Sequence, residues 1–152
     1  MIFLPILNTW KILEKTVFLD TGPLVALFRE RDQFHQWVKI ELSKNDFRFI
    51  TCEAVLTETL FLTQNTPEVI EAISEMVESE MIVIQSALIS SRKTVFEKLM
   101  KYHDQKTSLA DISLLVLYEQ QSNISILTTD SDFLIYRDSK GKPLKLISPY
   151  LK

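Results

Sequence analysis

The stretch VFLDTGPLVALF, residues 17–28, decides how this chain folds. Its first residues, Val17-Phe18-Leu19, are an apolar β-branched and aromatic run that predicts a buried strand, and Gly22-Pro23 separates this run from a second apolar segment with helical spacing. Asp20 is therefore expected where a strand ends, which is where ligands gather in open α/β sheets. Alternatively, Asp20 begins an Asx turn or caps the following helix.

Composition sets the broad class of protein. The 152 residues are 46% hydrophobic and 24% charged, as expected of one globular domain spanning residues 1–152. A single cysteine, Cys52, excludes an internal disulfide and suits a cytoplasmic protein. One Cys and two His cannot form a zinc cluster. The formal charge of −3 argues against a strong general attraction to nucleic acid, so such a role requires local patches or metal.

The first fifteen residues form an extra segment in this interpretation. The apolar run Met1–Leu7 is interrupted by Pro5, lacks a basic start and has no small-residue cleavage site after it, unlike a signal peptide. We expect residues 1–15 to pack on the domain. Apolar runs elsewhere are too short to cross a bilayer, so we expect a soluble protein with no membrane partner.

Strand-like and helix-like segments alternate along the rest of the chain. The expected helices include two within residues 23–42, the second starting near Asp32, one opened by Thr66-Pro67, and one over residues 88–102. The alternation predicts an α/β fold with a mainly parallel sheet. The expected strands cover residues 16–20, 47–51, 81–86, 124–128 and 144–148.

Glu58 is the first acid in an unexpected place. A helix after Glu53 would align Ala54, Val55, Glu58, Phe61 and Leu62 on one stripe, which places Glu58 within an apolar face. A buried carboxylate normally has an ion pair, a raised pKa or a metal. Pairing with a Lys or Arg at the edge of the core is the simpler alternative.

Asp111 opens a helix that is apolar on nearly all sides, in the segment SLADISLLVLYEQ. Such a helix is expected to be buried, with Asp111 in its first turn. Ser108 and Asp111 also have the spacing of a capping box, so a purely local role for Asp111 is a serious alternative.

Two further acids, Asp130 and Asp132, follow the predicted strand at residues 124–128. This strand is the second one that ends on aspartate. Turn chemistry readily explains one such acid but not the whole set.

Taken in order, DTGPLVALF, the Glu58 helix after FRFITC, SLADISLL and TTDSDF resemble a PIN-domain ribonuclease, in particular the VapC-type toxins of toxin–antitoxin pairs. The resemblance covers about residues 17–148. It implies a three-layer α/β/α fold with a mainly parallel, roughly five-stranded sheet, an RNA substrate, a small antitoxin and a homodimer. It assigns catalytic and metal-binding roles to Asp20, Glu58, Asp111 and Asp130, with Asp132 sharing or assisting the last role.

The chemistry of such a cluster is consistent with this resemblance. Two carboxylates 4 Å apart repel each other by roughly 4 kcal/mol at an effective dielectric constant near 20, so cations are needed to hold four of them together. Oxygen ligands favour Mg²⁺ or Mn²⁺, which can activate water and neutralise charge on a phosphodiester.

Three other functions remain open at this point. A housekeeping RNA-processing nuclease would share the same site, and a non-catalytic interaction module would use the acids as caps and ion pairs. A magnesium-dependent phosphotransfer domain is disfavoured because Asp20 is followed by Thr21-Gly22 and not by the Asp-x-Asp-x-Thr pattern.

An acid-lined site is also expected to attract a basic partner. An antitoxin arginine would pair with the carboxylates, and we expect an apolar groove near Leu24, Leu27, Phe28 and Trp37 to anchor the partner. The homodimer surface is expected to include the region of Tyr102.

Overall fold

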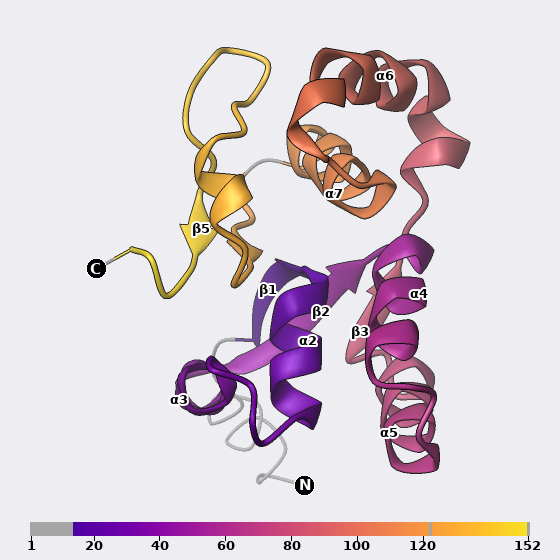
Figure 1. The fold of residues 1–152 in the computed structure, drawn as a ribbon, viewed down its shortest axis with the longest axis vertical. Helices are drawn as coiled ribbons and strands as arrows, with labels where there is room; N and C mark the ends of the chain where they lie inside the picture. Colours follow the sequence, from indigo (N-terminus) through magenta and orange to yellow (C-terminus); the bar gives the residue numbers. More distant parts are fainter. Residues whose placement is uncertain (1–13, 122, 152) are drawn as a thin grey trace, which may run out of the picture.

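The computed structural model describes residues 14–121 and 123–151, and its centre is a parallel sheet (Figure 1). The sheet has five strands in the order β3-β2-β1-β4-β5, and all its pairings are parallel. Their bounds are β1 Glu14–Leu19, β2 Asp46–Thr51, β3 Ile82–Ile84, β4 Ile126–Leu127 and β5 Leu146–Ile147. All five predicted strands therefore form, each near its predicted place.

The central strand is β1, as its apolar sequence predicts. Val17 and Phe18 are fully buried, and Phe18 is in register with Ile50 of β2 and Ile126 of β4. The Thr51 hydroxyl donates a hydrogen bond of 2.7 Å to the carbonyl oxygen of Leu19, which ties the ends of β1 and β2 together. The carboxyl end of β1 is thus held firmly just before Asp20.

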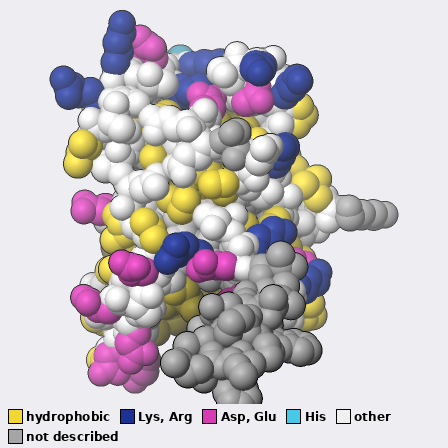
Figure 2. Space-filling model, turned by 180° about the vertical axis from the view of Figure 1, so that it is seen from behind, with side chains coloured by type: hydrophobic (Ala, Val, Ile, Leu, Met, Phe, Trp, Pro, Cys, Tyr) yellow, Lys and Arg dark blue, Asp and Glu magenta, His cyan; other side chains and the backbone are white. Residues whose placement is uncertain are grey.

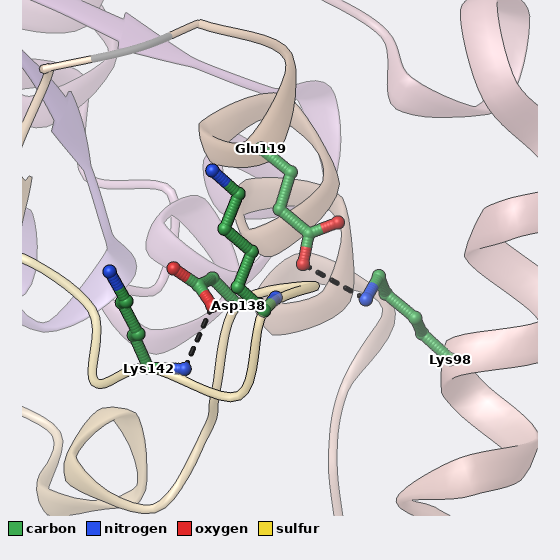
Figure 3. A network of polar contacts seen from close by, with 5 residues as sticks. Lys98, Glu119, Asp138 and Lys142 are labelled. Carbon is green, nitrogen blue, oxygen red and sulfur yellow. Dashed lines mark hydrogen bonds and ion pairs between the residues drawn. The ribbon is translucent and has the colours of Figure 1, made fainter.

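Helices cover the sheet in a three-layer α/β/α arrangement. Helix α2 contacts α3 and α4, and helix α6 packs on α7. Lys98 and Glu119 link α6 to α7 through an ion pair of 3.0 Å whose side chains are only 14% and 16% exposed (Figure 3). The bounds are α2 Thr21–Phe28, α3 His35–Ser43, α4 Glu53–Leu62, α5 Pro67–Glu78, α6 Ala87–Lys101 and α7 Leu109–Gln120.

The helix α7 is buried along most of its length, as its sequence predicts. Its residues from Ala110 to Leu117 are all buried, so its carboxylate at Asp111 enters the interior of the protein. Two 3₁₀ turns complete the description, η1 at His103–Gln105 before α7 and η2 at Ser131–Leu134 after β4.

The predicted apolar stripe around Glu58 is wrong. Val55 is fully buried, but Phe61 and Leu62 are 79% and 42% exposed. The inner face of α4 is formed by Val55 and Thr59, whose hydroxyl bonds to the Val55 carbonyl and so needs no external partner. Glu58 therefore lies at the border of this face and is half-buried.

The second predicted helix after Gly22 starts later than expected. The carboxylate of Asp32 accepts a hydrogen bond of 2.8 Å from the Phe34 amide, so Asp32 forms a turn, and α3 begins only at His35. The helix at Pro67 begins as predicted, with Thr66 as its N-cap residue.

The expected extra segment at residues 1–15 lies mostly outside the described residues, which begin at Glu14. Among the described residues, no helix combines the length and apolar character needed to span a bilayer.

Candidate active site

A cavity of about 500 Å³ at the carboxyl ends of β1 and β4 is lined by Asp32, from the turn before α3, and by four of the predicted acids. These four are Asp20, which directly follows β1, Glu58 in the middle of α4, Asp111 in the first turn of α7, and Asp130, three residues after β4. The sheet topology explains this meeting, because β1 and β4 are neighbours and run in parallel. These four predicted site residues are thus brought together.

Asp20 is the most deeply buried of the four, with only 3% of its surface exposed. It occupies the N-cap position of α2, but its side chain makes no capping hydrogen bond, which removes the capping alternative. Its Oδ2 accepts a hydrogen bond of 2.7 Å from the Thr128 hydroxyl. Burial, followed by the nearby charge of Asp111, raises the pKa of Asp20 to about 7.

Asp111 is fixed from two sides. Its backbone amide donates to the Ser108 hydroxyl at 3.0 Å, which is the local cap that the sequence suggested. Its carboxylate, however, accepts a hydrogen bond of 2.8 Å from the Tyr136 hydroxyl, a contact across 25 residues. Burial raises the pKa of Asp111 to about 6, although the bond from Tyr136 opposes this shift.

Asp130 is held through its backbone and its side chain. Its amide donates to the Thr128 hydroxyl at 3.0 Å, so Thr128 connects Asp130 with Asp20. Its Oδ1 accepts a hydrogen bond of 2.9 Å from the amide of Asp132. The carboxyl group of Asp132 is not part of the cavity wall, and its pKa is raised by partial burial and by the charge of Asp130.

Glu58 accepts a hydrogen bond of 2.9 Å from the hydroxyl of Thr21, the first residue of α2. Within residues 14–121 and 123–151 it makes no ion pair with Lys or Arg, so the expected core-edge pair is not observed there. Glu58 reaches the cavity from α4.

The donor set fits a hard divalent cation. Each of the four carboxylates has an oxygen fixed by a protein donor, and none of them belongs to an ion pair among the described residues. Four buried or half-buried carboxylates without basic partners are costly unless a proton or a cation neutralises them. In the described part of the chain, however, no three such groups are already close enough to hold a metal ion.

Three features of the site were not predicted from the sequence. The bond from Tyr136 to Asp111 could not be recognised, because a tyrosine in DFLIY reads as an ordinary core residue. Arg29 also lines the cavity, where its guanidinium donates to the carbonyl oxygen of Leu62. Finally, Gly22 is needed because a Cβ atom there would overlap the Thr129 hydroxyl on the cavity wall.

Comparison with known proteins now identifies the family. The PIN domain family model matches residues 17–138, so this chain belongs to the PIN domain family. The fold is also similar to the crystal structure of Mycobacterium tuberculosis VapC20, described as a sarcin-ricin loop cleaving toxin, with a TM-score of 0.65 and 18% sequence identity. That match covers 76% of this chain and 91% of VapC20. Curated protein sequences gave no match.

One of the two expected interaction surfaces needs correction. Leu24 is only 2% exposed and cannot line a groove, but Leu27 and Phe28 do line one of about 730 Å³ together with Phe47, Phe49 and Met76. Trp37 is half-buried and is not part of its wall. Tyr102 itself is only 6% exposed, because its ring packs against Tyr136 at 5.1 Å, but Met100, two residues earlier, is 71% exposed, so a dimer surface in this region stays a prediction.

Proposed function

We propose that this protein is a metal-dependent endoribonuclease that hydrolyses RNA phosphodiester bonds. The observation that carries the proposal is the cavity lined by Asp20, Glu58, Asp111 and Asp130, four carboxylates without basic partners in the described part of the chain. Membership of the PIN domain family supports the same reading.

Asp20, Glu58, Asp111 and Asp130 are the residues that would hold Mg²⁺ or Mn²⁺. Both ions prefer oxygen ligands, and the donor set offers carboxylate oxygens alone. A bound divalent ion supplies an activated water and neutralises charge on the phosphodiester. Asp132 does not line the cavity, so we assign it the role of fixing Asp130 through its amide.

The protein's own contribution is preorganisation. Thr128 holds Asp20 and the backbone of Asp130, Tyr136 holds Asp111, and Thr21 holds Glu58. These bonds hold each carboxylate at the cavity before RNA arrives. The acids would still have to move closer together to bind a cation, because no three of them are close enough for this among the described residues. The single cation on the cavity wall, within the described residues, is Arg29, whose guanidinium donates to the Leu62 carbonyl oxygen and forms no ion pair with the four acids.

RNA cleavage tests this proposal directly. Purified protein is incubated with a structured RNA in Mg²⁺ or Mn²⁺, with and without EDTA. We expect RNA cleavage that EDTA stops and that Asp111→Asn abolishes. The control Asp46→Asn changes an exposed carboxylate at the first residue of β2 and should keep full activity. Cleavage that is indifferent to EDTA would exclude the metal mechanism.

We further propose that the nuclease is a cytoplasmic toxin neutralised by a small antitoxin. The similarity to VapC20 supports a toxin, but at 18% identity the RNA cut by VapC20 is not carried over to this chain. Co-expression with the neighbouring small reading frame should restore growth that expression of this protein alone suppresses. The opposite outcome is that cells expressing this protein alone grow as well as the co-expressing cells, with the protein confirmed as expressed and the cellular RNA intact. That result would favour a housekeeping nuclease.

The antitoxin would make two contacts of different character. One of its arginines would pair with the carboxylates of the cavity. An apolar segment next to basic residues would fill the groove at Leu27 and Phe28, because Asp46 and Glu75 add negative charge to this groove. Antitoxin variants that lack the arginine are expected to bind more weakly and to leave the nuclease active.

A homodimer is the assembly that we propose for the toxin. Phe96 and Met100 lie one helical turn apart on α6 and are 61% and 71% exposed, and Ile89 on the same helix is 83% exposed. Large apolar side chains with such exposure are typical of surfaces that contact another subunit. Light scattering should give the mass of a dimer, and Phe96→Glu should give the mass of a monomer.

A further inference from the structure

One long stretch of this chain carries acidic residues and no basic ones. Residues 49–91 contain seven acidic and no basic residues, and five of the acids lie in residues 68–80, in and just after α5. Basic residues recur from Arg92 onward. Figure 2 shows the result in space, with Lys and Arg side chains gathered at the end of the molecule formed by α6 and the chain before β5, and acids gathered over α5.

One part of the basic end, which we call the first arm, consists of Lys101 and Lys106. Both side chains are exposed, and neither makes an ion pair among the described residues. Lys101 places its ammonium group 5.2 Å from the centre of the Tyr102 ring. Lys106 has a φ of 53°, a left-handed conformation that favours glycine or asparagine over lysine.

The second arm is the turn at residues 138–142, which presents Lys140 and Lys142. The turn is well ordered, because Asp138 Oδ1 accepts a hydrogen bond of 2.8 Å from the backbone amide of Lys142 (Figure 3). The same oxygen accepts a second bond, of 2.9 Å, from the backbone amide of Lys140. Gly141 supplies the positive φ of 76° that the turn requires. Both lysine side chains are exposed, and neither forms an ion pair within residues 14–121 and 123–151.

Tyr136 connects both arms to the acidic cavity. Its hydroxyl donates to the carboxylate of Asp111 at 2.8 Å, and the hydroxyl of Thr107, the residue after Lys106, lies within hydrogen-bond distance of the same Tyr136 oxygen at 3.2 Å. Its ring packs against Tyr102, the residue after Lys101, and the second arm begins two residues after it. The bases of both arms are thus connected through Tyr136 to Asp111, a residue of the cavity wall.

We propose that Lys101, Lys106, Lys140 and Lys142 bind the phosphate backbone of RNA and position it beside the cavity. The proposal rests on the nuclease function proposed above. A protein of net charge −3 with an acid-lined site repels RNA, so productive binding requires a local basic surface. Unpaired, exposed lysines on two ordered turns provide that surface, and phosphate contacts of this kind fix the register of the nucleic acid without reading its sequence.

Binding of a labelled RNA hairpin in EDTA tests the proposal without cleavage. Each lysine that contacts a phosphate contributes roughly 0.7 to 0.9 to the slope of log affinity against log salt. The double variant Lys101→Ala/Lys106→Ala should therefore lower this slope by about 1.5, and the variant of all four lysines by about 3. The control Lys39→Ala/Lys44→Ala, which removes exposed Lys39 of α3 and exposed Lys44 directly after this helix, should bind like the wild type.

Lys106 allows a test that separates charge from structure. Lys106→Gly removes the charge but suits the positive φ, so the melting temperature should stay the same or rise while RNA affinity falls. Lys106→Arg should keep the affinity. In cleavage assays the lysine variants should raise KM and leave kcat unchanged.

The outcomes distinguish this proposal from the proposed function. Lysine-dependent binding without any cleavage would leave the RNA surface in place and refute the nuclease. Cleavage with unchanged KM in the four-lysine variant would refute the RNA surface and leave the nuclease intact. Failure of the wild type to bind RNA at low salt would also overturn the proposal. So would a control variant, Lys39→Ala/Lys44→Ala, that loses as much RNA affinity as Lys101→Ala/Lys106→Ala.

Discussion

Replacing Asp20 with asparagine should stabilise the metal-free protein while it abolishes cleavage. Asp20 is 3% exposed, and burial raises its pKa to about 7 from an ordinary value of 3.8. A shift of about three pKa units corresponds to about 4 kcal/mol, which is the cost of holding the ionised carboxylate in the folded protein. Asparagine cannot ionise, and its side-chain oxygen can still accept the hydrogen bond from Thr128.

The sign of this effect depends on pH. Below pH 3.8 the carboxyl group is protonated in both the folded and the unfolded state, and no cost arises. Between pH 3.8 and about 7 the folded state keeps a proton that the unfolded state has released, so the free energy of unfolding falls as pH rises. Above about pH 7 the cost is complete and constant. Asp20→Asn should thus have its largest stabilising effect in alkaline solution.

Thermal melting in EDTA measures the effect. At about pH 8.5 we expect Asp20→Asn to be more stable than the wild type by roughly 2 to 4 kcal/mol, or about 5 to 15 °C in melting temperature for a domain of this size. At about pH 4 the two proteins should melt at nearly the same temperature. Asp46→Asn, the exposed control, should show no such difference. A lower melting temperature for Asp20→Asn at high pH would refute this reasoning and indicate a structural role for the carboxylate.

Three further predictions follow from contacts around the site and the core. Tyr136→Phe removes hydrogen bonds to Asp111 and Thr107, so denaturant unfolding should show a loss of about 1 to 2 kcal/mol, and the pKa of Asp111 should rise further in a carboxyl NMR titration. Gly22→Ala forces its new Cβ against the Thr129 hydroxyl, so it should lower the free energy of unfolding by about 1 to 3 kcal/mol. Adding Thr129→Ala to this variant should recover part of the lost stability. Lys98→Met leaves the little-exposed Glu119 without its partner and should lower the free energy of unfolding by about 3 kcal/mol. The double variant Lys98→Met/Glu119→Leu should have a melting temperature close to that of the wild type.

The elements that local patterns specify could be predicted from the sequence. The strand before Asp20 and the buried helix of Asp111 are coded by runs of apolar residues, and their order along the chain gives the α/β alternation. Four acids could also be selected, because each is unusual in its own segment: two follow strands, one opens a buried helix and one, Glu58, lies in the middle of α4. Their meeting in one cavity follows from the parallel order of β1 and β4.

Contacts between distant segments could not be predicted in this way. Apolar periodicity placed Glu58 inside a buried stripe, but Phe61 and Leu62 turned out to face solvent, since periodicity alone does not say which face of a helix meets the core. The bond from Tyr136 to Asp111 joins residues 25 positions apart, and no local pattern marks it. The groove beside α2 was placed near Leu24, which the fold buries completely.

Binding of Mn²⁺ to the metal-free protein is the measurement that tests the central claim most directly. Isothermal titration of the wild type should show saturable binding that releases protons, because Asp20 and Asp111 have raised pKa values and must lose their protons to bind the ion. Asp20→Asn should lose this binding, and Asp46→Asn should keep it. Absence of Mn²⁺ binding in the wild type, or equal binding in Asp20→Asn, would contradict the assignment of the four carboxylates as a metal site.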